Sequence, residues 1–114
     1  ISRRASQHNQ INDFVSDPLR VDYVTRTVIV EGQRIHLTPI EYSLLRILVQ
    51  NIGKVITHTF FLRELWGPNS ERHAEYLRVH INHLRKKLGA VVGGRIQTET
   101  GIGYRFVENA RNNI

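Results

Sequence analysis

Residues 70–88 restrict the fold more than any other part of the chain, because their sequence, SERHAEYLRVHINHLRKKL, predicts one helix with two unlike faces. One side would hold apolar residues at spacings of three and four: Ala74, Leu77, Ile81, Leu84 and Leu88. The opposite side would hold a mostly polar and basic set: Arg72, Glu75, Tyr76, Val79, Asn82, His83, Lys86 and Lys87. Helices that lie in a DNA groove often carry such an outer face, so we expect a recognition helix.

The charge of the chain favours a polyanionic partner. The formal net charge is +6 over 114 residues, which fits DNA, RNA or an anionic membrane surface. Between Arg72 and Lys87, five Lys and Arg residues accompany one acidic residue, Glu75. No apolar run approaches the roughly 18 residues of a membrane span, so no membrane partner is expected. The lack of cysteine excludes disulfides and suits a reducing cytoplasm, where we expect the protein.

The remaining segments predict a single α+β domain over residues 18–108. Residues 1–17 lack sustained periodicity, and we interpret them as a linker or the end of a preceding domain. Residues 109–114 are interpreted as a polar C-terminal tail. Alternating and β-branched residues over 19–37 predict a small N-terminal antiparallel sheet.

Capping residues indicate where the first two helices begin. The segment 38–41, TPIE, combines an N-cap residue, a proline at the first helical position and a capping box. A largely buried helix should therefore run from there to a stop at 51–53. Thr57 can cap a second, shorter helix over residues 58–66.

The third helix and the segment after it complete the predicted fold. Asn69 or Ser70 would cap this helix, and Gly89 would end it. After a loop at 91–94, residues 95–107 predict a β-hairpin. A small sheet, three helices and a hairpin, in this order, predict a winged helix-turn-helix in which the hairpin is the wing.

Side-chain chemistry divides the outer face of the third helix into two sets. Readers are residues that can contact base edges, and anchors are residues that can bind phosphates. Val79 can contact a thymine methyl group, and Asn82 and His83 can hydrogen-bond to base edges. Arg72, Lys86 and Lys87 suit phosphates, which set affinity rather than sequence preference.

Four other residues of these helices belong to the expected DNA-binding set. Arg78 and Arg85 lie nearer the core edge, from which they could reach the DNA backbone or pair with an acidic residue such as Glu41. The ring of Trp66 predicts core packing, while its indole N–H can donate to a phosphate. Tyr76 is an aromatic residue on the outer face.

No catalytic, cofactor or metal site is expected, so the chain is not predicted to be an enzyme. His73 and His80 lie about 10 Å apart along a helix axis, a distance that one ion cannot bridge. Two other functions stay open. A winged helix can bind proteins through the same helix, and RNA binding would require more stacking aromatics than Tyr76. The basic outer face favours duplex DNA over a protein partner.

Five motifs occur in order along the chain: LTPIEYxLL at 37–45, GKV at 53–55, LWG at 65–67, VHIxxLRxKL at 79–88 and GxGYRF at 101–106. Together they resemble the signature of the OmpR/PhoB-type response-regulator effector domain, over about residues 19–107. Residues 66–69, 76–78 and 98–106 look most like the members that regulate potassium-transport genes.

This resemblance implies a transcription factor of a two-component system, in which a phosphorylatable receiver domain precedes the present chain. The implied partners are double-stranded DNA, the protein's own receiver domain, a homodimer partner, a sensor histidine kinase acting through the receiver, and RNA polymerase. The turn at 67–72 would contact the polymerase.

The resemblance also implies roles for the wing. The wing tip of the family enters the minor groove, often with an Arg, but the matching residue here is Thr100. Thr98 and Tyr104 are implied to bind phosphates, although Tyr104 could instead simply pack on Ile96. Phosphate-regulon members carry Arg where this chain has Glu75, Asn82 and His83, so we expect a different base preference.

We predict a strong dependence of DNA binding on salt. If the domain makes about five phosphate contacts, the logarithm of the binding constant should fall against the logarithm of salt concentration with a slope of about −4 to −5. Fluorescence anisotropy with a labelled duplex measures this slope. A slope near zero would contradict the electrostatic interpretation.

Overall fold

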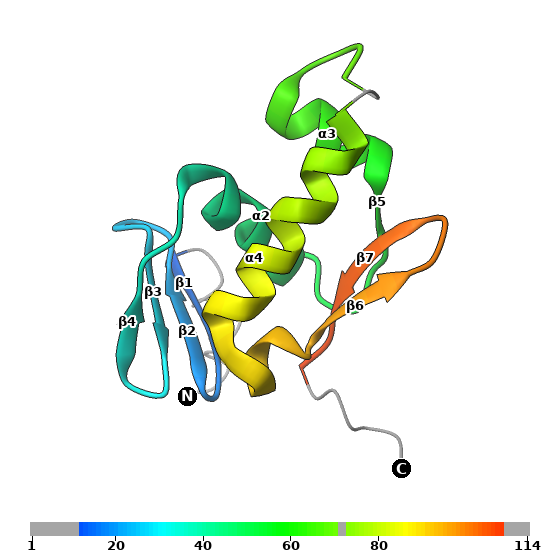
Figure 1. The fold of residues 1–114 in the computed structure, drawn as a ribbon. Coiled ribbons are helices and arrows are strands. Elements are labelled where there is room, and N and C mark those ends of the chain that lie inside the picture. Colours follow the sequence, from blue (N-terminus) through cyan, green and yellow to red (C-terminus); the bar gives the residue numbers. More distant parts are fainter. Residues whose placement is uncertain (1–11, 71–72, 109–114) are drawn as a thin grey trace.

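The computed structural model describes residues 12–70 and 73–108. Its N-terminal part is an antiparallel sheet in the order β1-β2-β3-β4 (Figure 1), formed by β1 (Asp13–Ser16), β2 (Leu19–Asp22), β3 (Thr27–Val30) and β4 (Gln33–Ile35). Within the described residues three helices follow: α2 (Pro39–Val49), α3 (His58–Trp66) and α4 (Ala74–Gly93). A second sheet, in the order β5-β7-β6, consists of β5 (Ile56–Thr57), β7 (Gly103–Phe106) and β6 (Ile96–Glu99). The predicted winged helix-turn-helix is confirmed.

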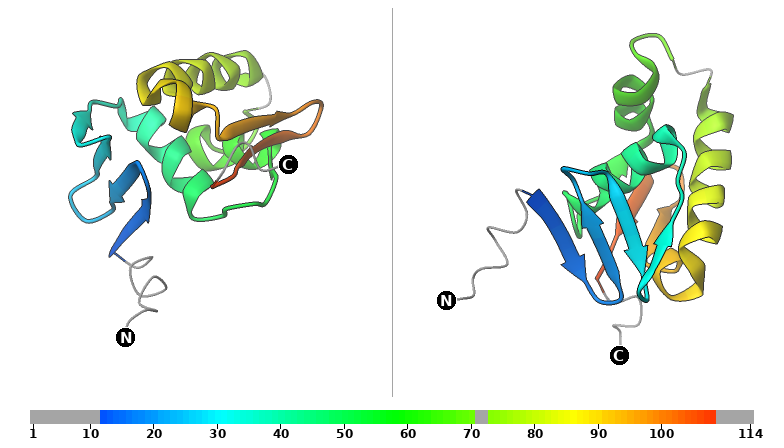
Figure 2. Two further views of the ribbon diagram at one scale, coloured as in Figure 1. Left: turned by 90° about the horizontal axis from the view of Figure 1, so that it is seen from below. Right: turned by 90° about the vertical axis from the view of Figure 1, so that its left-hand side faces the viewer.

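The apolar sides of these elements meet in one core. Figure 2 shows α2 between the N-terminal sheet and the hairpin, with α4 lying across it. The core takes side chains from both sheets and all three helices, including Val21, Leu45, Phe61, Leu84 and Phe106. No helix in the described part of the chain is both long and apolar enough to cross a membrane.

The sheet begins earlier than the sequence predicted. Asp13–Ser16 pairs with β2, so the interpretation of these residues as linker is wrong, while residues 1–11 lie outside the described part. The ring of Phe14 meets that of Phe106 edge to face at 6.2 Å. Arg95, also buried, donates to the carbonyl oxygen of Asp17 at 2.8 Å. A four-residue strand with one buried side chain is too short to show a period of two.

The predicted N-caps of α2 and α3 are confirmed. Thr38 Oγ1 accepts from the Glu41 N–H at 3.2 Å, and Glu41 Oε1 accepts from the Thr38 N–H at 2.9 Å, which completes the capping box. Thr57 Oγ1 accepts from the Phe60 N–H at 3.1 Å in the same way.

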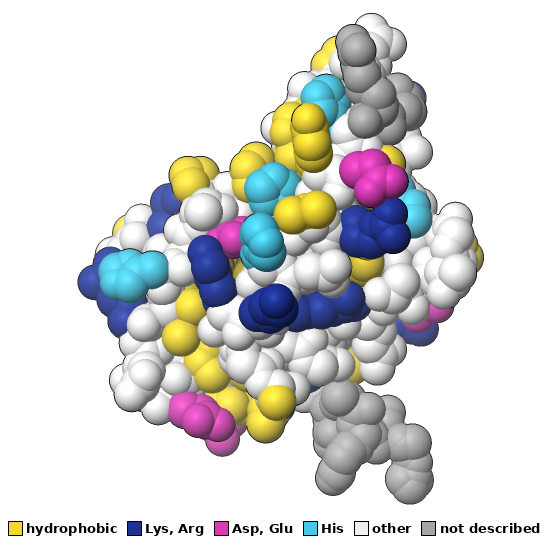
Figure 3. Space-filling view, viewed as in Figure 1, with side chains coloured by type: hydrophobic (Ala, Val, Ile, Leu, Met, Phe, Trp, Pro, Cys, Tyr) yellow, Lys and Arg dark blue, Asp and Glu magenta, His cyan; other side chains and the backbone are white. Residues whose placement is uncertain are grey.

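The start of α4 differs from the prediction. The helix begins at Ala74, and His73 at its N-cap makes no side-chain hydrogen bond. Ser70, one of the predicted caps, is instead buried, and its hydroxyl donates to the carbonyl oxygen of Gly67 at 2.6 Å. Ala74 is exposed rather than buried. The other predicted inward residues are buried, namely Leu77, Ile81, Leu84 and Leu88, and the opposite side of α4 lies on the surface that Figure 3 shows.

Gly89 interrupts α4 at the residue where the sequence predicted its end. Its φ of 92° lies in the left-handed region that glycine adopts without strain. A further helical turn covers residues 90–93, where a loop was predicted, and Val92 in this turn is buried. A Cβ atom on Gly93 would lie 2.4 Å from the Arg85 carbonyl oxygen, so glycine lets this turn pack against α4.

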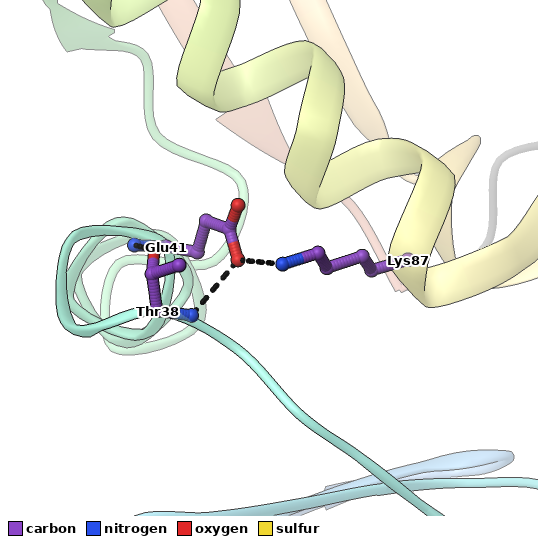
Figure 4. Close-up of polar contacts among 3 residues, drawn as sticks. All are labelled: Thr38, Glu41 and Lys87. Atoms are coloured by element: carbon purple, nitrogen blue, oxygen red, sulfur yellow. Dashed lines mark hydrogen bonds and ion pairs between the residues drawn. The ribbon is translucent and has the colours of Figure 1, made fainter.

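A buried ion pair joins the beginning of α2 to α4 (Figure 4). Glu41 is 2% exposed, and its Oε1 accepts from Lys87 Nζ at 2.7 Å as well as from the Thr38 N–H. Burial alone would raise the pKa of the Glu41 carboxyl, but the hydrogen bonds from Lys87 and Thr38 hold this pKa below its ordinary value of 4.5. Glu41 is therefore ionised inside the fold at neutral pH.

We predict that Glu41→Gln removes a pH-dependent part of the stability. Because the pKa of Glu41 is lowered in the folded chain, its ionised form stabilises the fold fully above about pH 4.5, and this contribution is lost as the pH falls through the lowered pKa. Urea titrations should show that the difference in free energy of unfolding between wild type and variant shrinks towards acidic pH.

The matched control for this experiment is Glu75→Gln, because Glu75 pairs with Arg78 at the exposed surface, where ion pairs contribute little. If the difference in free energy of unfolding between wild type and Glu41→Gln stays constant from neutral to acidic pH, this result contradicts the stabilising role of the carboxylate.

Candidate nucleic-acid interface

The exposed side of α4 carries the residues predicted to read bases. Val79 and Tyr76 are 46% and 57% exposed although both side chains are large, and Asn82 and His83 are exposed on the same helix. Lys, Arg and His side chains gather along this face (Figure 3). Because the other side of α4 is held in the core, this strip of methyl, amide and imidazole groups is fixed facing outward.

Lys87 is the basic residue of α4 that neutralises Glu41. The sequence allowed Arg78 or Arg85 to pair with an acidic residue such as Glu41. Arg78 does pair with an acidic residue, but it is Glu75, and Lys87 rather than either arginine pairs with Glu41. Lys87 is 39% exposed on its side chain, but its charge is directed towards α2 rather than outward. This contact reduces its suitability as a phosphate anchor.

Two other cations of α4 are better placed for phosphates. Arg78 Nη2 pairs with Glu75 Oε1 at 3.1 Å, and both side chains are more than 60% exposed, so the pair is weak and Arg78 can exchange it for a phosphate. Lys86 is exposed, and no ion pair involves it in the part of the chain that the structure describes. Arg72, the remaining predicted anchor, lies outside the described residues.

Arg85 connects α4 to the wing. Its Nε and Nη2 donate to the Ile96 carbonyl oxygen at 3.1 and 2.8 Å, and Nη2 also donates to Thr98 Oγ1 at 2.7 Å. Its Nη1 lies 3.4 Å from Asn82 Oδ1, and its guanidinium carbon lies 5.8 Å from the centre of the Tyr104 ring. One α4 side chain therefore contacts β6 and lies near the Tyr104 ring of β7.

The wing lies beside the N-terminal half of α4. Thr98 and Thr100 are exposed, whereas Tyr104 is buried, with its ring 5.5 Å from that of His58 and 6.2 Å from that of Phe61. A cleft of about 260 Å³ separates α4 from the wing, and it is lined by His58, Ala74, Glu75, Arg78, Thr98, Thr100, Gly101 and Tyr104.

His58 was not among the predicted site residues, although it lines this cleft. The cap at Thr57 correctly indicated that His58 begins α3. Its position beside Tyr104 depends on the pairing of β5 with β7, in which Thr57 lies opposite Gly103. A two-residue strand leaves no periodic signal, so the sequence could not show this approach.

Trp66 belongs to an aromatic cluster at the N-terminal end of α4. Its ring is parallel to that of His73 at a centroid distance of 6.0 Å and lies 5.9 Å from that of His80. The ring of Tyr76 lies 5.4 Å from that of His73. Trp66 is partly buried, which agrees with the core packing expected of its ring. Among the described residues, no three His, Asp or Glu side chains are placed to hold a metal ion.

Comparison with known families and curated proteins identifies relatives of the chain. Residues 32–106 match the family described as "Transcriptional regulatory protein, C terminal". The KDP operon transcriptional regulatory protein KdpE of Escherichia coli K12 is 45% identical over 89 residues, or 76% of this chain and 40% of the relative. Response regulator protein PmrA of Pseudomonas aeruginosa is 37% identical over 101 residues, or 89% of this chain and 44% of the relative. The chain spans less than half the length of these relatives.

Solved structures share the fold. Response regulator DrrB of Thermotoga maritima, an OmpR/PhoB homologue, has a TM-score of 0.75 at 27% identity, covering 90% of this chain and 50% of DrrB. The DNA-binding domain of Klebsiella pneumoniae RstA, solved in complex with the RstA box, has a TM-score of 0.75 at 25% identity, covering 85% of this chain and 98% of that one.

The family match runs from the turn before β4 to the end of β7, so it includes all three described helices and the wing. The chain therefore belongs to the OmpR/PhoB-type family of response-regulator DNA-binding effector domains.

Proposed function

We propose that the domain binds duplex DNA sequence-specifically, with α4 in the major groove and the wing against the adjacent backbone. The observation that carries this proposal is the exposed face of α4, where Val79, Asn82 and His83 face outward beside Lys86. Leu77, Ile81, Leu84 and Leu88 on the opposite side of the same helix are buried, which supplies the rigid support that base reading requires. The RstA domain, which shares the fold, was solved with its DNA box.

The structure supports a division of labour among the candidate residues. Val79, Asn82 and His83 are the proposed base readers. Lys86, Arg78 and Arg72 are the proposed phosphate anchors from α4 and the turn before it. Thr98, Thr100, Tyr104 and Trp66 are proposed to contact the backbone from the sides, and Tyr76 from the first turn of α4. Lys87 is reassigned to holding Glu41.

The relatives support a wider role. We infer that the domain controls transcription as the output part of a two-component regulator, whose receiver domain is phosphorylated by a sensor histidine kinase. A homodimer partner and RNA polymerase, the latter at the 67–72 turn, are the other proposed partners. Relatives named KdpE support control of potassium-transport genes.

We predict that His83→Ala and Lys86→Ala affect binding differently. Loss of a base contact should change the ranking of duplex sequences, whereas loss of a phosphate contact should weaken binding to all sequences by a similar factor. Competition assays with a selected duplex and a random duplex measure both effects. Equal effects of the two variants on both duplexes would remove His83 from the readers.

We predict a second contrast between neighbouring lysines. Lys86→Met should reduce the salt slope of DNA binding by about one and leave the free energy of unfolding nearly unchanged. Lys87→Met should lower the free energy of unfolding, because Glu41 would stay buried without its cation. Urea titration and binding at several salt concentrations separate the two outcomes. If Lys87→Met unfolds with the wild-type free energy but has a reduced salt slope of DNA binding, Lys87 is a phosphate anchor.

The same assays test the other open function. A winged helix that binds a protein partner would show no preference for duplex DNA over other polyanions, and its binding would not depend on His83. Neither result is expected from a helix face that combines exposed base-reading groups with an unpaired lysine among the described residues.

A further inference from the structure

The guanidinium of Arg85 is held by four hydrogen bonds, and two of them reach proposed DNA-contacting residues. The Ile96 carbonyl oxygen accepts from both Nε and Nη2, which fixes the plane of the group against β6. Thr98 Oγ1 and Asn82 Oδ1 accept the other two bonds, at 2.7 and 3.4 Å. Arg85 is only partly exposed. A guanidinium in this position is a fixed fork between the recognition helix and the wing.

The contact between Arg85 and Asn82 orients the Asn82 carboxamide. A guanidinium only donates hydrogen bonds, so the carboxamide of Asn82 must turn its oxygen towards Arg85. Its Nδ2 amino group is then the part that remains directed away from Arg85. Asparagine reads adenine by presenting Oδ1 and Nδ2 together to the N6 and N7 atoms. With one lone pair of Oδ1 engaged by a cation, Asn82 presents the Oδ1 and Nδ2 pair less well than it presents the Nδ2 donors.

The same contact orients the Thr98 hydroxyl. Because Thr98 Oγ1 accepts from Arg85, the hydrogen of this hydroxyl is directed elsewhere and can be donated to a phosphate oxygen. Donation from a positively charged group also strengthens the hydroxyl as a donor. Arg85 therefore leaves both neighbours facing the DNA with hydrogen-bond donors.

We propose that Arg85 is a positioning residue that turns Asn82 into a donor-only reader of guanine and Thr98 into a phosphate donor. This inference rests on the proposed function. Guanine places two acceptors, O6 and N7, side by side in the major groove, and both attract the Nδ2 hydrogens. Adenine places an amino donor beside N7, and this donor faces the positive charge of Arg85.

The experiment starts from random-sequence duplex DNA, from which the domain selects a binding site. Each base pair of that site is then replaced by the other three, and dissociation constants are measured for wild type, Asn82→Ala, Asn82→Asp, Arg85→Met and Arg85→Lys. Salt slopes are measured on the best duplex. Thermal unfolding confirms that each variant is folded.

Wild type should prefer guanine at one position by about fivefold to a hundredfold, the range of a good base contact. Asn82→Ala should abolish that preference, and Asn82→Asp, which only accepts, should move it towards cytosine. Arg85→Met should abolish or weaken the guanine preference at the same position, while the salt slope of DNA binding changes by less than one. Arg85→Lys should fail to restore it, because one ammonium group cannot replace the fork.

Three results would overturn this proposal alone. A guanine preference that persists in Asn82→Ala would remove Asn82 as its reader. An Arg85→Met variant with unchanged base preferences and a slope reduced by about one would make Arg85 a phosphate anchor instead. If Arg85→Met does not fold, full guanine preference in Arg85→Lys would reject the positioning role. Selection of no sequence by wild type would overturn the proposed function together with this inference.

Discussion

The buried carboxylate of Glu41 links the beginning of α2 to α4. A carboxylate removed from water destabilises the fold unless donors surround it, and here the Lys87 ammonium and the Thr38 N–H both donate to it. Apolar packing alone tolerates small rotations of a helix about its axis. The ion pair adds a directional contact to the packing of the buried leucines and Ile81, which holds Val79, Asn82 and His83 outward. The proposed reading face is therefore supported by a contact about one helical turn beyond His83.

Local signals made most of the fold predictable. The capping box at Thr38 and Glu41, the cap at Thr57 and the three-four spacing from Leu77 to Leu88 are all encoded within a few residues. The misses have a common cause. β1 is a four-residue strand with one buried side chain, β5 is a two-residue strand whose partner β7 is distant in sequence, and α4 begins at Ala74 without a side-chain cap from His73. None of these elements has a clear signal in its own residues.

The candidate site was predictable in one respect and not in another. Helical periodicity correctly indicated which residues of α4 face outward. It could not show what the basic ones contact, because Lys87 meets a residue 46 positions away and Arg85 reaches across to the wing. Arg78, Arg85 and Lys87 look alike in the sequence, yet one makes a surface pair, one fixes the hairpin and one neutralises a buried acid. The sequence showed which residues of α4 are charged, but it could not show which of those charges are already paired within the fold.

The break at Gly89 limits how many base pairs one copy of the domain can contact through α4. The straight part of α4 ends there, and the proposed readers lie within a short stretch before it. Each base pair offers four alternatives, so three readers distinguish at most about 64 sequences. A genome presents about a million or more competing sites. Three proposed readers alone therefore leave a single domain far short of the discrimination that one genomic site requires.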